Sequence, residues 1–487
     1  MILTLDLGTS TTKAVVWDSE GPEVMGRAGL LTTFPAGDRA EQDPSQWWPA
    51  VRAACAQARA ASPSSFDAVE AIGFAAARQT FVPVTDTGEA LGPALVWSDG
   101  RASGEALVMA GELGGMDAVR ARTGAFLDGS SMAAKVAWWA GNEPDRWARS
   151  RWLLTPRDFA AWKMTGEVAT DASMVSAAGL TDAAGRLVPE LTAGWGQRLP
   201  PVLRSDAVVG LLSAGAAGEL GLKAGIPVVI GAGDRACEVL GTAATTDRPM
   251  VAWGTTANVS VPVRNFPDPV PPGLMVTRGA TGGWLLEGGL SAAGSALTWL
   301  SSLTGRDTEA LMAAARAAPA GARGVIALPW FSGARAPWWK AGARAGFVGL
   351  SFNHDHGDLA RALIEAVASE VRRCLTAAGA RSPGDGGAAT GLALTGADET
   401  TAPWAEVLTA VTGLPAVRRR SGQSASAGAA LLTSEAVGAG FVLDQLDPVI
   451  ETVPPDAGLT AKYAEQRARI DAAADAVISL DAWEQNQ

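Results

Sequence analysis

One short pattern, which occurs once in each half of the chain, constrains the fold more than any other feature of the sequence. Residues 5–15 read as a β-strand, a Gly8-Thr9-Ser10 turn and a second β-strand, and residues 251–261 repeat this order around Gly254-Thr255-Thr256. Apolar runs that flank a glycine turn are typical of β-hairpins. Their repetition at a long interval favours two lobes of the same architecture. Chance recurrence in a chain with 57 glycines is the alternative.

The remaining patterns predict a mixed α/β protein. The 487 residues are too many for one hydrophobic core, so two domains are the natural expectation. Residues 227–233 form an apolar strand that ends in glycine, and a short helix is expected at 235–243. In the later half strands and helices alternate, as in the strand at 392–395, the helix at 403–411 and the Ala-rich helix at 424–437. This alternation indicates α/β lobes.

Composition excludes several classes of function. The formal net charge is −11, which argues against nucleic acid as a partner because phosphate backbones are held by clustered Lys and Arg. Three dispersed cysteines suit a reducing cytoplasm, and two histidines are too few for a structural zinc site or a Ser-His-Asp enzyme. The N-terminus shows no signal peptide, and no apolar run is long enough to span a bilayer. We therefore expect a soluble cytoplasmic enzyme.

The Gly8-Thr9-Ser10 turn has the chemistry of a phosphate-binding loop. Its backbone N–H groups and two hydroxyls lie in a small volume, and glycine lets the backbone approach an anion closely. Asp6 precedes the turn, where a carboxylate is costly unless a cation such as Mg²⁺ neutralises it. Lys13, on the far side of the hairpin, can reach back to the phosphates. An ordinary hairpin with exposed polar residues is the alternative, but two such turns favour a nucleotide clamped between lobes.

Asp234 follows the apolar strand in the run Gly231-Ala232-Gly233-Asp234. A carboxylate at the C-terminal end of a strand lies over the ligand crevice of an α/β lobe. Phosphoryl transfer to an alcohol needs a base that accepts the hydroxyl proton, and Asp is suited to that role. The local sequence equally allows Asp234 to cap a helix that begins at Arg235.

Together these motifs resemble those of the FGGY family of carbohydrate kinases. Asp6-Leu7-Gly8-Thr9-Ser10 with Lys13 is similar to the family's N-terminal phosphate motif, and Gly231-Ala232-Gly233-Asp234 is similar to its catalytic-Asp motif. The matches are collinear from residue 6 to about residue 430, so chance is not a serious alternative. The other resemblances, in chain order, are Trp97-Ser98-Asp99-Gly100-Arg101, residues 135–138, Thr170-Asp171 with Ser173, Gly333-Ala334-Arg335-Ala336-Pro337, and Gly346-Phe347-Val348-Gly349-Leu350.

The resemblance implies an α/β protein with the two-lobed, actin-like ATPase fold (ribonuclease H-like) and a cleft between the lobes. It divides the chain into a sugar-binding N-terminal domain at 1–242, an ATP-binding C-terminal domain at 243–440 and a helical extension at 441–487. It implies ATP and Mg²⁺ as cofactors, Asp6 and Asp234 as metal ligands, and Asp234 as the catalytic base. The expected ATP-binding residues are Gly8, Thr9, Ser10, Lys13, Gly254, Thr255, Thr256, Gly396 and Ala397.

The acceptor site departs from the pattern of the xylulokinase-like members, which have Gln-Met-His where this chain has Ala77-Arg78-Gln79. The run Arg78-Gln79-Thr80 instead resembles the Arg-Glu-Thr that contacts glycerol in glycerol kinase, and a salt bridge to a nearby carboxylate is the alternative for Arg78. Arg235 stands where Gln is usual, so an acidic sugar is a further alternative. We expect a pentulose such as xylulose first and a polyol such as glycerol or erythritol next, bound by Arg78, Gln79, Trp97, Asp99, Asp234 and Arg235.

The expected adenine-binding segment departs as well, because Gly396-Ala397-Asp398-Glu399-Thr400 replaces a run of glycines followed by Lys or Arg. Two acidic residues do not favour phosphate, so a non-catalytic sugar or nucleotide sensor is the alternative to a kinase. A relative that only hydrolyses ATP is disfavoured by the polyol-like set of Arg78, Gln79, Trp97 and Asp99. The expected partners are ATP and a small sugar or polyol, with a homodimer left open.

Overall fold

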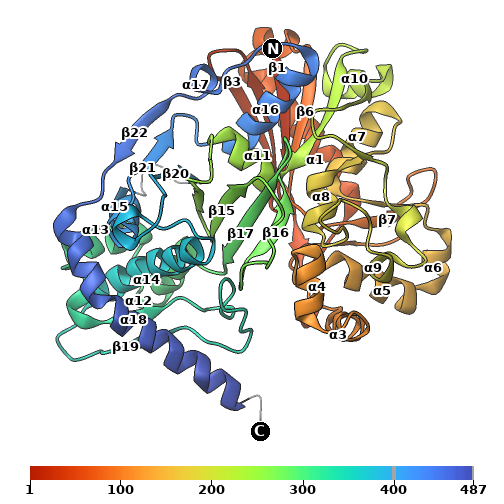
Figure 1. Cartoon of the computed structure of the whole chain (residues 1–487). Helices are drawn as coiled ribbons and strands as arrows, with labels where there is room; N and C mark the ends of the chain where they lie inside the picture. The colour runs from red at the N-terminus through yellow and green to blue at the C-terminus, as the bar shows by residue number, and fades with distance from the viewer. Residues whose placement is uncertain (397–401, 485–487) are drawn as a thin grey trace.

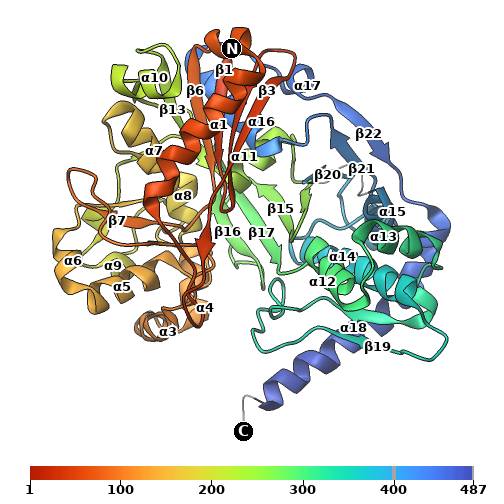
Figure 2. The ribbon, with the colours of Figure 1, turned by 180° about the vertical axis from the view of Figure 1, so that it is seen from behind.

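The computed structural model describes residues 1–396 and 402–484, which form two lobes that each contain a large β-sheet (Figure 1, Figure 2). The first sheet is built from β1 (Ile2–Leu7), β2 (Thr11–Trp17), β3 (Pro22–Gly29), β6 (Ala71–Ala76), β12 (Val208–Leu211) and β13 (Pro227–Gly233). Their order is β12-β13-β6-β1-β2-β3. β1 pairs antiparallel with β2 and β2 with β3, whereas β6 runs parallel to both β1 and β13.

The second sheet repeats this arrangement. It contains β14 (Met250–Trp253), β15 (Ala257–Val263), β16 (Met275–Arg278), β17 (Trp284–Leu290), β20 (Leu392–Thr395), β21 (Ala416–Arg419) and β22 (Val449–Val453), in the order β16-β17-β15-β14-β20-β21-β22. β15 pairs antiparallel with β14 and β17, whereas β20 runs parallel to β14 and β21. The run β3-β2-β1-β6-β13 therefore reappears as β17-β15-β14-β20-β21, which confirms the predicted two-lobed α/β fold.

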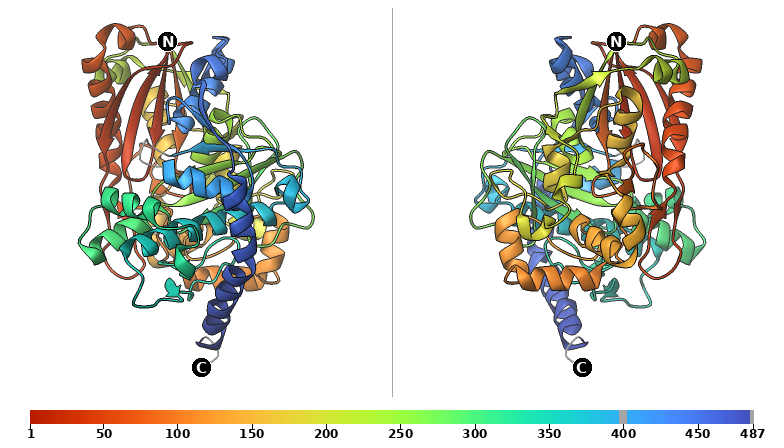
Figure 3. Two further views of the ribbon diagram at one scale, coloured as in Figure 1. Left: turned by 90° about the vertical axis from the view of Figure 1, so that its left-hand side faces the viewer. Right: turned by 90° about the vertical axis from the view of Figure 1, so that its right-hand side faces the viewer.

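Two helices that are distant in the sequence pack together beside the first sheet (Figure 1), and the side views show C-terminal segments in blue next to the N-terminal strands in red (Figure 3). α11 (Asp234–Gly241) packs against α16 (Ser424–Val437), and α16 also packs on β1, β6 and β13 of the first sheet. The helix backbones approach closely: a Cβ added to Gly428 would lie 2.0 Å from the carbonyl oxygen of Cys237. Only glycine permits this contact. A helix from the C-terminal half of the chain therefore packs on the first sheet, and its contact with α11 requires glycine.

The region between β6 and β12 forms the outer part of the first lobe and has its own apolar core. No helix in the described ranges combines the length and hydropathy that a membrane crossing requires. The elements of this outer region are β7 (Val82–Val84), β8 (Ala94–Leu95), β9 (Trp152–Leu154), β10 (Thr170–Asp171), β11 (Val202–Leu203), α3 (Ser103–Glu112), α4 (Met116–Thr123), α5 (Met132–Asn142), α6 (Pro144–Arg149), α7 (Pro156–Thr165), α8 (Ala172–Ala177) and α9 (Pro189–Thr192).

The remaining elements cover the two sheets. In the first lobe they are β4 (Thr32–Thr33), β5 (Glu41–Gln42), α1 (Trp47–Ala61), α2 (Pro63–Asp67) and α10 (Ala214–Leu220). In the second half of the chain they are α12 (Gly294–Thr304), α13 (Thr308–Ala317), β18 (Ile326–Leu328), β19 (Gly346–Val348), α14 (His356–Ala377), α15 (Ala402–Thr412), α17 (Leu443–Leu446) and α18 (Ala457–Glu484).

Candidate active site

A cavity of about 300 Å³ lies between the lobes and is lined by residues of both. A second cavity, of about 670 Å³, adjoins it and shares Trp97, Thr256, Arg335 and Trp339 as lining residues. One residue of each Gly-Thr turn, Thr9 and Thr256, faces the first cavity, so both turns border one cleft. Five of the six expected acceptor residues also line it, namely Arg78, Gln79, Trp97, Asp234 and Arg235.

The path of β13 places Asp234 at this cavity. The pairing of β13 with β6 shifts register between Val229 and Ala232, and Gly231 has φ 68° within this bulge. A Cβ on Gly231 would lie 1.8 Å from the carbonyl oxygen of Phe74, so the bulge requires glycine. Asp234 is the first residue of α11, while Gly233 holds the N-cap position. The carboxylate therefore belongs to the first turn of the helix, not to its N-cap, and it lines the cleft.

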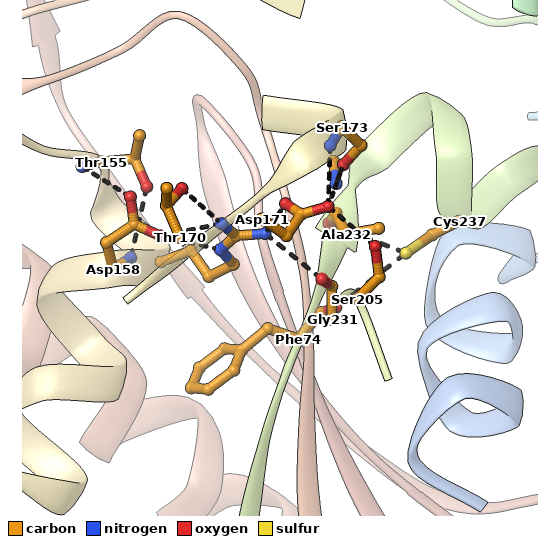
Figure 4. A network of polar contacts seen from close by, with 12 residues as sticks. Phe74, Thr155, Asp158, Thr170, Asp171, Ser173, Ser205, Gly231, Ala232 and Cys237 are labelled. Carbon is orange, nitrogen blue, oxygen red and sulfur yellow. Dashed lines mark hydrogen bonds and ion pairs between the residues drawn. The ribbon is translucent and has the colours of Figure 1, made fainter. Parts of the chain in front are cut away.

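A buried polar network holds the end of β13 in place (Figure 4). Arg157 donates from Nη1 to Asp171 Oδ1 at 2.6 Å and pairs with Asp158 as well. Asp171 Oδ2 accepts from the hydroxyls of Ser173 and Ser205 at 2.6 and 2.8 Å. Ser173 Oγ in turn accepts from the backbone N–H of Gly233 at 2.8 Å. This chain of bonds fixes the residue that precedes Asp234.

The Asp234 carboxylate is held on one oxygen only. Oδ1 accepts from the backbone N–H of Arg235 at 2.7 Å and lies 3.2 Å from Arg78 Nε. Within residues 1–396 and 402–484, Oδ2 accepts no hydrogen bond. One carboxylate oxygen is thus oriented by the protein while the other is available in the cavity.

Arg78 links the two lobes through Glu287 of β17. Its Nη1 and Nη2 donate to Glu287 Oε1 and Oε2, each at 2.7 Å, in a bidentate pair. Burial alone would raise the pKa of Glu287, but the charge of Arg78 and the hydrogen bonds from Arg78 and Thr277 lower it below its usual range. The salt bridge that the sequence left open as an alternative for Arg78 is therefore present, and Arg78 still faces the cavity.

Arg235 is neutralised on its own helix. Its guanidinium forms an ion pair with Glu238, one turn further along α11. Burial would lower the pKa of Arg235, but the Glu238 and Asp234 carboxylates raise it. Burial likewise raises the pKa of Glu238, and Arg235 offsets this only in part. The positive charge of Arg235 beside Asp234 is therefore already paired with the carboxylate of Glu238.

Asp6 and Asp234 form a donor set that suits Mg²⁺. Asp6 pairs with Lys13 across the hairpin at 3.5 Å between Oδ2 and Nζ. Burial raises the pKa of Asp6, and the nearby Asp234 charge raises it further while Lys13 lowers it. No group of three or more His, Cys, Asp or Glu side chains suited to a metal occurs in the described part of the chain. Two carboxylates fit Mg²⁺, which keeps several waters and is held through one or two carboxylates plus phosphates.

The two turns are built to leave their backbone open to a ligand. In the first, Gly8 donates to Thr11 O at 3.1 Å, and Thr9 O accepts from Gln42 Nε2 at 2.6 Å. In the second, Ser295 donates from its backbone N and from Oγ to Thr255 O, at 3.1 and 2.9 Å. The N–H groups of Gly8 and Gly254 are used inside the turns, Gly254 donating to Thr256 O at 2.9 Å. The N–H groups of Thr9, Ser10, Thr255 and Thr256 donate to no described residue, so they are open to an anion.

Gly396 lies against the second turn. With φ 77° it follows β20, and a Cβ on it would lie 3.0 Å from Trp253 O. A Cβ on Gly254 would lie 4.0 Å from Gly396 O, so these two glycines border the same space. Ala397, the other residue expected there, lies outside the described residues.

Gln79 and Trp97 form a wall of the cavity, whereas Asp99 does not. Trp97 is 39% exposed, and its Nε1 donates to Thr9 Oγ1 at 2.9 Å. β8 ends at Leu95, so Trp97 lies just beyond this strand. Asp99 is fully buried and accepts from Ala40 N and from Arg101, which occupies both carboxylate oxygens. Asp99 therefore stabilises the fold of this segment and does not line the cavity.

Sequence reasoning missed most of the residues that line the cavity from the second lobe, among them Glu287, Arg335 and Trp339. A glutamate followed by two glycines inside the apolar strand β17 was a usable signal for Glu287. Arg335 lies in a loop whose resemblance was noted without a role. Its guanidinium has neither a hydrogen bond nor an ion pair with any described residue and lies 5.4 Å above the Trp339 ring. Burial lowers the pKa of Arg335, with only the charge of Asp128 opposing.

This combination defines a class of protein. Two similar α/β lobes, each with a hydroxyl-bearing glycine turn facing a shared cleft that contains an oriented carboxylate, form a phosphotransferase of the actin-like ATPase fold. The chain belongs to the FGGY family of carbohydrate kinases: the N-terminal domain of that family matches residues 1–241 and the C-terminal domain matches residues 250–437. It is an ATP-dependent carbohydrate kinase that uses Mg²⁺, as the resemblance implied.

Individual relatives agree with this assignment. The chain is 28% identical to the xylulose kinase of Escherichia coli over 383 residues, which cover 75% of this chain and 76% of that protein. It is 29% identical to a glycerol kinase of Leptothrix cholodnii over 483 residues, covering 93% and 95%. The crystal structure of the xylulose kinase from Rhodospirillum rubrum superposes with a TM-score of 0.87 at 26% identity, covering 99% of both chains.

Proposed function

We propose that this kinase transfers a phosphoryl group from ATP to a hydroxyl of a small sugar, with Asp234 as the general base. The observation that carries the proposal is the Asp234 carboxylate, which is oriented through Oδ1 and open at Oδ2 in the cavity between the lobes. A base must lie within hydrogen-bond reach of the proton that it removes. In this geometry Oδ2 accepts the proton of the acceptor hydroxyl as the bond to phosphorus forms.

The residues of both turns serve the phosphate side of the reaction. The backbone N–H groups of Thr9, Ser10, Thr255 and Thr256 bind phosphate oxygens, Gly8 and Gly254 let the phosphates approach, and Lys13 neutralises part of their charge. Asp6, with Asp234 beside it, would hold Mg²⁺, which offsets charge on the phosphates when bound. Closure of the lobes over the cleft excludes water and so suppresses hydrolysis of ATP.

The acceptor side is rich in groups that bind hydroxyls. Gln79, Trp97 and the unpaired guanidinium of Arg335 line the cavity, and Arg78 and Arg235 are already paired with glutamates. Because the relatives include xylulose kinases and a glycerol kinase, xylulose is the first acceptor to test, with glycerol and erythritol next.

The experiment is a coupled assay of ADP release, with Mg²⁺ and a panel of ketopentoses, ketohexoses, polyols and sugar acids. The proposal expects one acceptor class to raise ADP release well above the rate without acceptor, and the product to carry phosphate on a carbon-bound oxygen by ³¹P NMR. Equal ADP release with every acceptor and with none would contradict it.

We also propose small-molecule partners and a cytoplasmic location for this kinase. The net charge of −11 supports small molecules and not nucleic acid as partners, and a cytoplasmic location suits a kinase that needs ATP. Light scattering of the purified chain tests whether it forms a homodimer.

A further inference from the structure

Lys135 is a buried lysine that the proposed mechanism does not use. It lies on α5 with its side chain fully buried. Its Nζ donates two hydrogen bonds to backbone carbonyls, at 3.0 Å to Gln79 O and 2.9 Å to Val96 O. The side chain therefore ends between two segments that are distant along the chain.

Both segments form walls of the cavity between the lobes. Gln79 lines the first cavity, and Val96 is followed directly by Trp97, which lines both cavities. Other bonds also hold the two segments: a backbone bridge joins Phe81 to Leu95, Trp97 N donates to Thr80 Oγ1 at 3.0 Å, and Gln79 Nε2 donates to Ala177 O at 2.8 Å. Lys135 differs from these because it reaches both segments from a separate helix and bonds to the carbonyl of Gln79 itself.

The backbone of Gln79 is held in an unfavourable conformation. Its φ is 65°, in the left-handed region, where a residue with a Cβ pays roughly 1–2 kcal/mol. Such a conformation persists only when the surroundings over-determine it. The bond from Lys135 to the Gln79 carbonyl is the contact that fixes the orientation of this peptide.

An ammonium group at this place is costly. The charged groups that face it are Asp99, Asp128 and Arg101, and none of the carboxylates in the described residues pairs with Lys135 within 4.0 Å. Burial lowers the pKa of Lys135 to about 7, against the attraction of Asp99 and Asp128. An apolar side chain would avoid that cost, so the two carbonyl bonds are the evident function of the amine.

We infer that Lys135 is a positioning residue for the acceptor: it fixes Gln79 in its left-handed conformation and sets Trp97 against it, so that both face the sugar. The inference rests on the proposed function for the identity of the ligand, but the positioning itself is independent of any ligand.

The test compares Lys135→Met with Lys163→Met, a control in which an exposed lysine of α7 is replaced. Hydrogen bonds to a charged group contribute about 1.5–3 kcal/mol, so Lys135→Met is expected to raise KM for the acceptor about tenfold or more. KM for ATP is expected to change much less. An unchanged acceptor KM in folded Lys135→Met, or equal increases for acceptor and ATP, would overturn the inference.

Hydrogen exchange measured without substrates separates this inference from the proposed function. Amide exchange in Lys135→Met is expected to rise in peptides that cover residues 77–98 and to stay as in the wild type in β14 and β15. A uniform rise across the first lobe would show a general structural role and overturn the inference. If the wild type phosphorylates no acceptor, the proposed function is wrong. The hydrogen-exchange measurement still shows whether Lys135 fixes the segments of Gln79 and Trp97.

A second variant keeps the test decisive where Lys135→Met does not fold. Glycine adopts φ 65° without strain, so the double variant Gln79→Gly with Lys135→Met is expected to fold even then. Failure of the double variant as well would show that Lys135 supports the core and not the conformation of residue 79, which contradicts the inference.

Discussion

The two arginines nearest to Asp234 are both neutralised by glutamates, Arg78 by Glu287 and Arg235 by Glu238. Each pair keeps a cation beside the carboxylate without adding net positive charge to the cavity. Arg335 differs, because its guanidinium has no carboxylate partner in the described part of the chain. At the scale of single residues, Arg335 is therefore the cavity arginine whose donors no described residue uses, whereas the Gln79 amide already donates to Ala177 O.

The pair of Arg78 and Glu287 allows its two roles to be separated. We expect Arg78→Met to impair use of the acceptor and to destabilise the fold, since it strands a buried carboxylate, which costs about 3–5 kcal/mol. Adding Glu287→Gln should restore much of the free energy of unfolding without restoring acceptor turnover. Urea unfolding and the kinetics of the single and double variants provide the measurement.

If the double variant recovers acceptor kinetics together with stability, Arg78 acts only as a partner of Glu287. In that case the expected contact between Arg78 and the substrate hydroxyls is wrong.

Lys135 also predicts a dependence of stability on pH. Its pKa is lowered to about 7 in the folded protein by burial, against 10.5 for an ordinary lysine. Between these values the unfolded chain binds more protons than the folded chain, so the contribution of this position to the free energy of unfolding rises with pH from about 7 to about 10.5. The difference between the wild type and Lys135→Met should follow this curve in urea titrations, and a flat or falling difference would contradict it.

Among the elements, α11 and α16 pack with their backbones close together. Gly428 and Gly241 bring the two helix backbones together, and α11 begins with Asp234. The packing of these two helices therefore sets the start of the helix that carries the base.

We expect Gly428→Ala to lower the free energy of unfolding by about 1–3 kcal/mol, because the added methyl overlaps the Cys237 carbonyl. Gly141→Ala in α5 is the matched control, since a Cβ there meets nothing within 4 Å. The control should be neutral or slightly stabilising, as alanine favours helix over glycine. Equal effects of both substitutions in urea unfolding would show that α16 tolerates displacement.

The elements that were predicted best have strong local signals. The strand at 227–233 and the helix at 424–437 match β13 and α16, because each is an unbroken run of suitable residues bounded by polar residues or glycine. Asp234 at the end of β13 followed from the same pattern. The paired turns were predicted because the glycine and hydroxyl residues recur in both halves.

The features that the sequence did not predict depend on contacts between residues far apart in the chain. Arg78 and Glu287 are 209 positions apart, so no local pattern indicates that they pair. The left-handed conformation of Gln79 is also invisible in the sequence, since glutamine rarely adopts it. Asp99 was expected at the acceptor because of the motif around it, but Arg101 and Ala40 N already occupy its oxygens.

Across the whole molecule, the lobes are linked at several places beside the cavity. Phe126 of the first lobe stacks on Trp339 of the second, with ring centroids 3.7 Å apart, and Val276 N donates to Gly124 O at 2.8 Å. Arg78, Glu287 and Trp339 line the cavity, so the ion pair and the aromatic stack lie at its border. A reaction that joins groups from both lobes requires them to meet in this way.

The central claim is that Asp234 removes the proton of the acceptor hydroxyl in this cleft. Asp234→Asn keeps the shape of the side chain but cannot take a proton, and base catalysis contributes about 10²–10⁴-fold. The measurement is the rate of phosphoryl transfer by purified, folded Asp234→Asn under saturating ATP, Mg²⁺ and acceptor, with nucleotide binding followed in parallel by calorimetry. The account predicts a fall of about a hundredfold or more with ATP binding retained. Turnover near that of the wild type would contradict it.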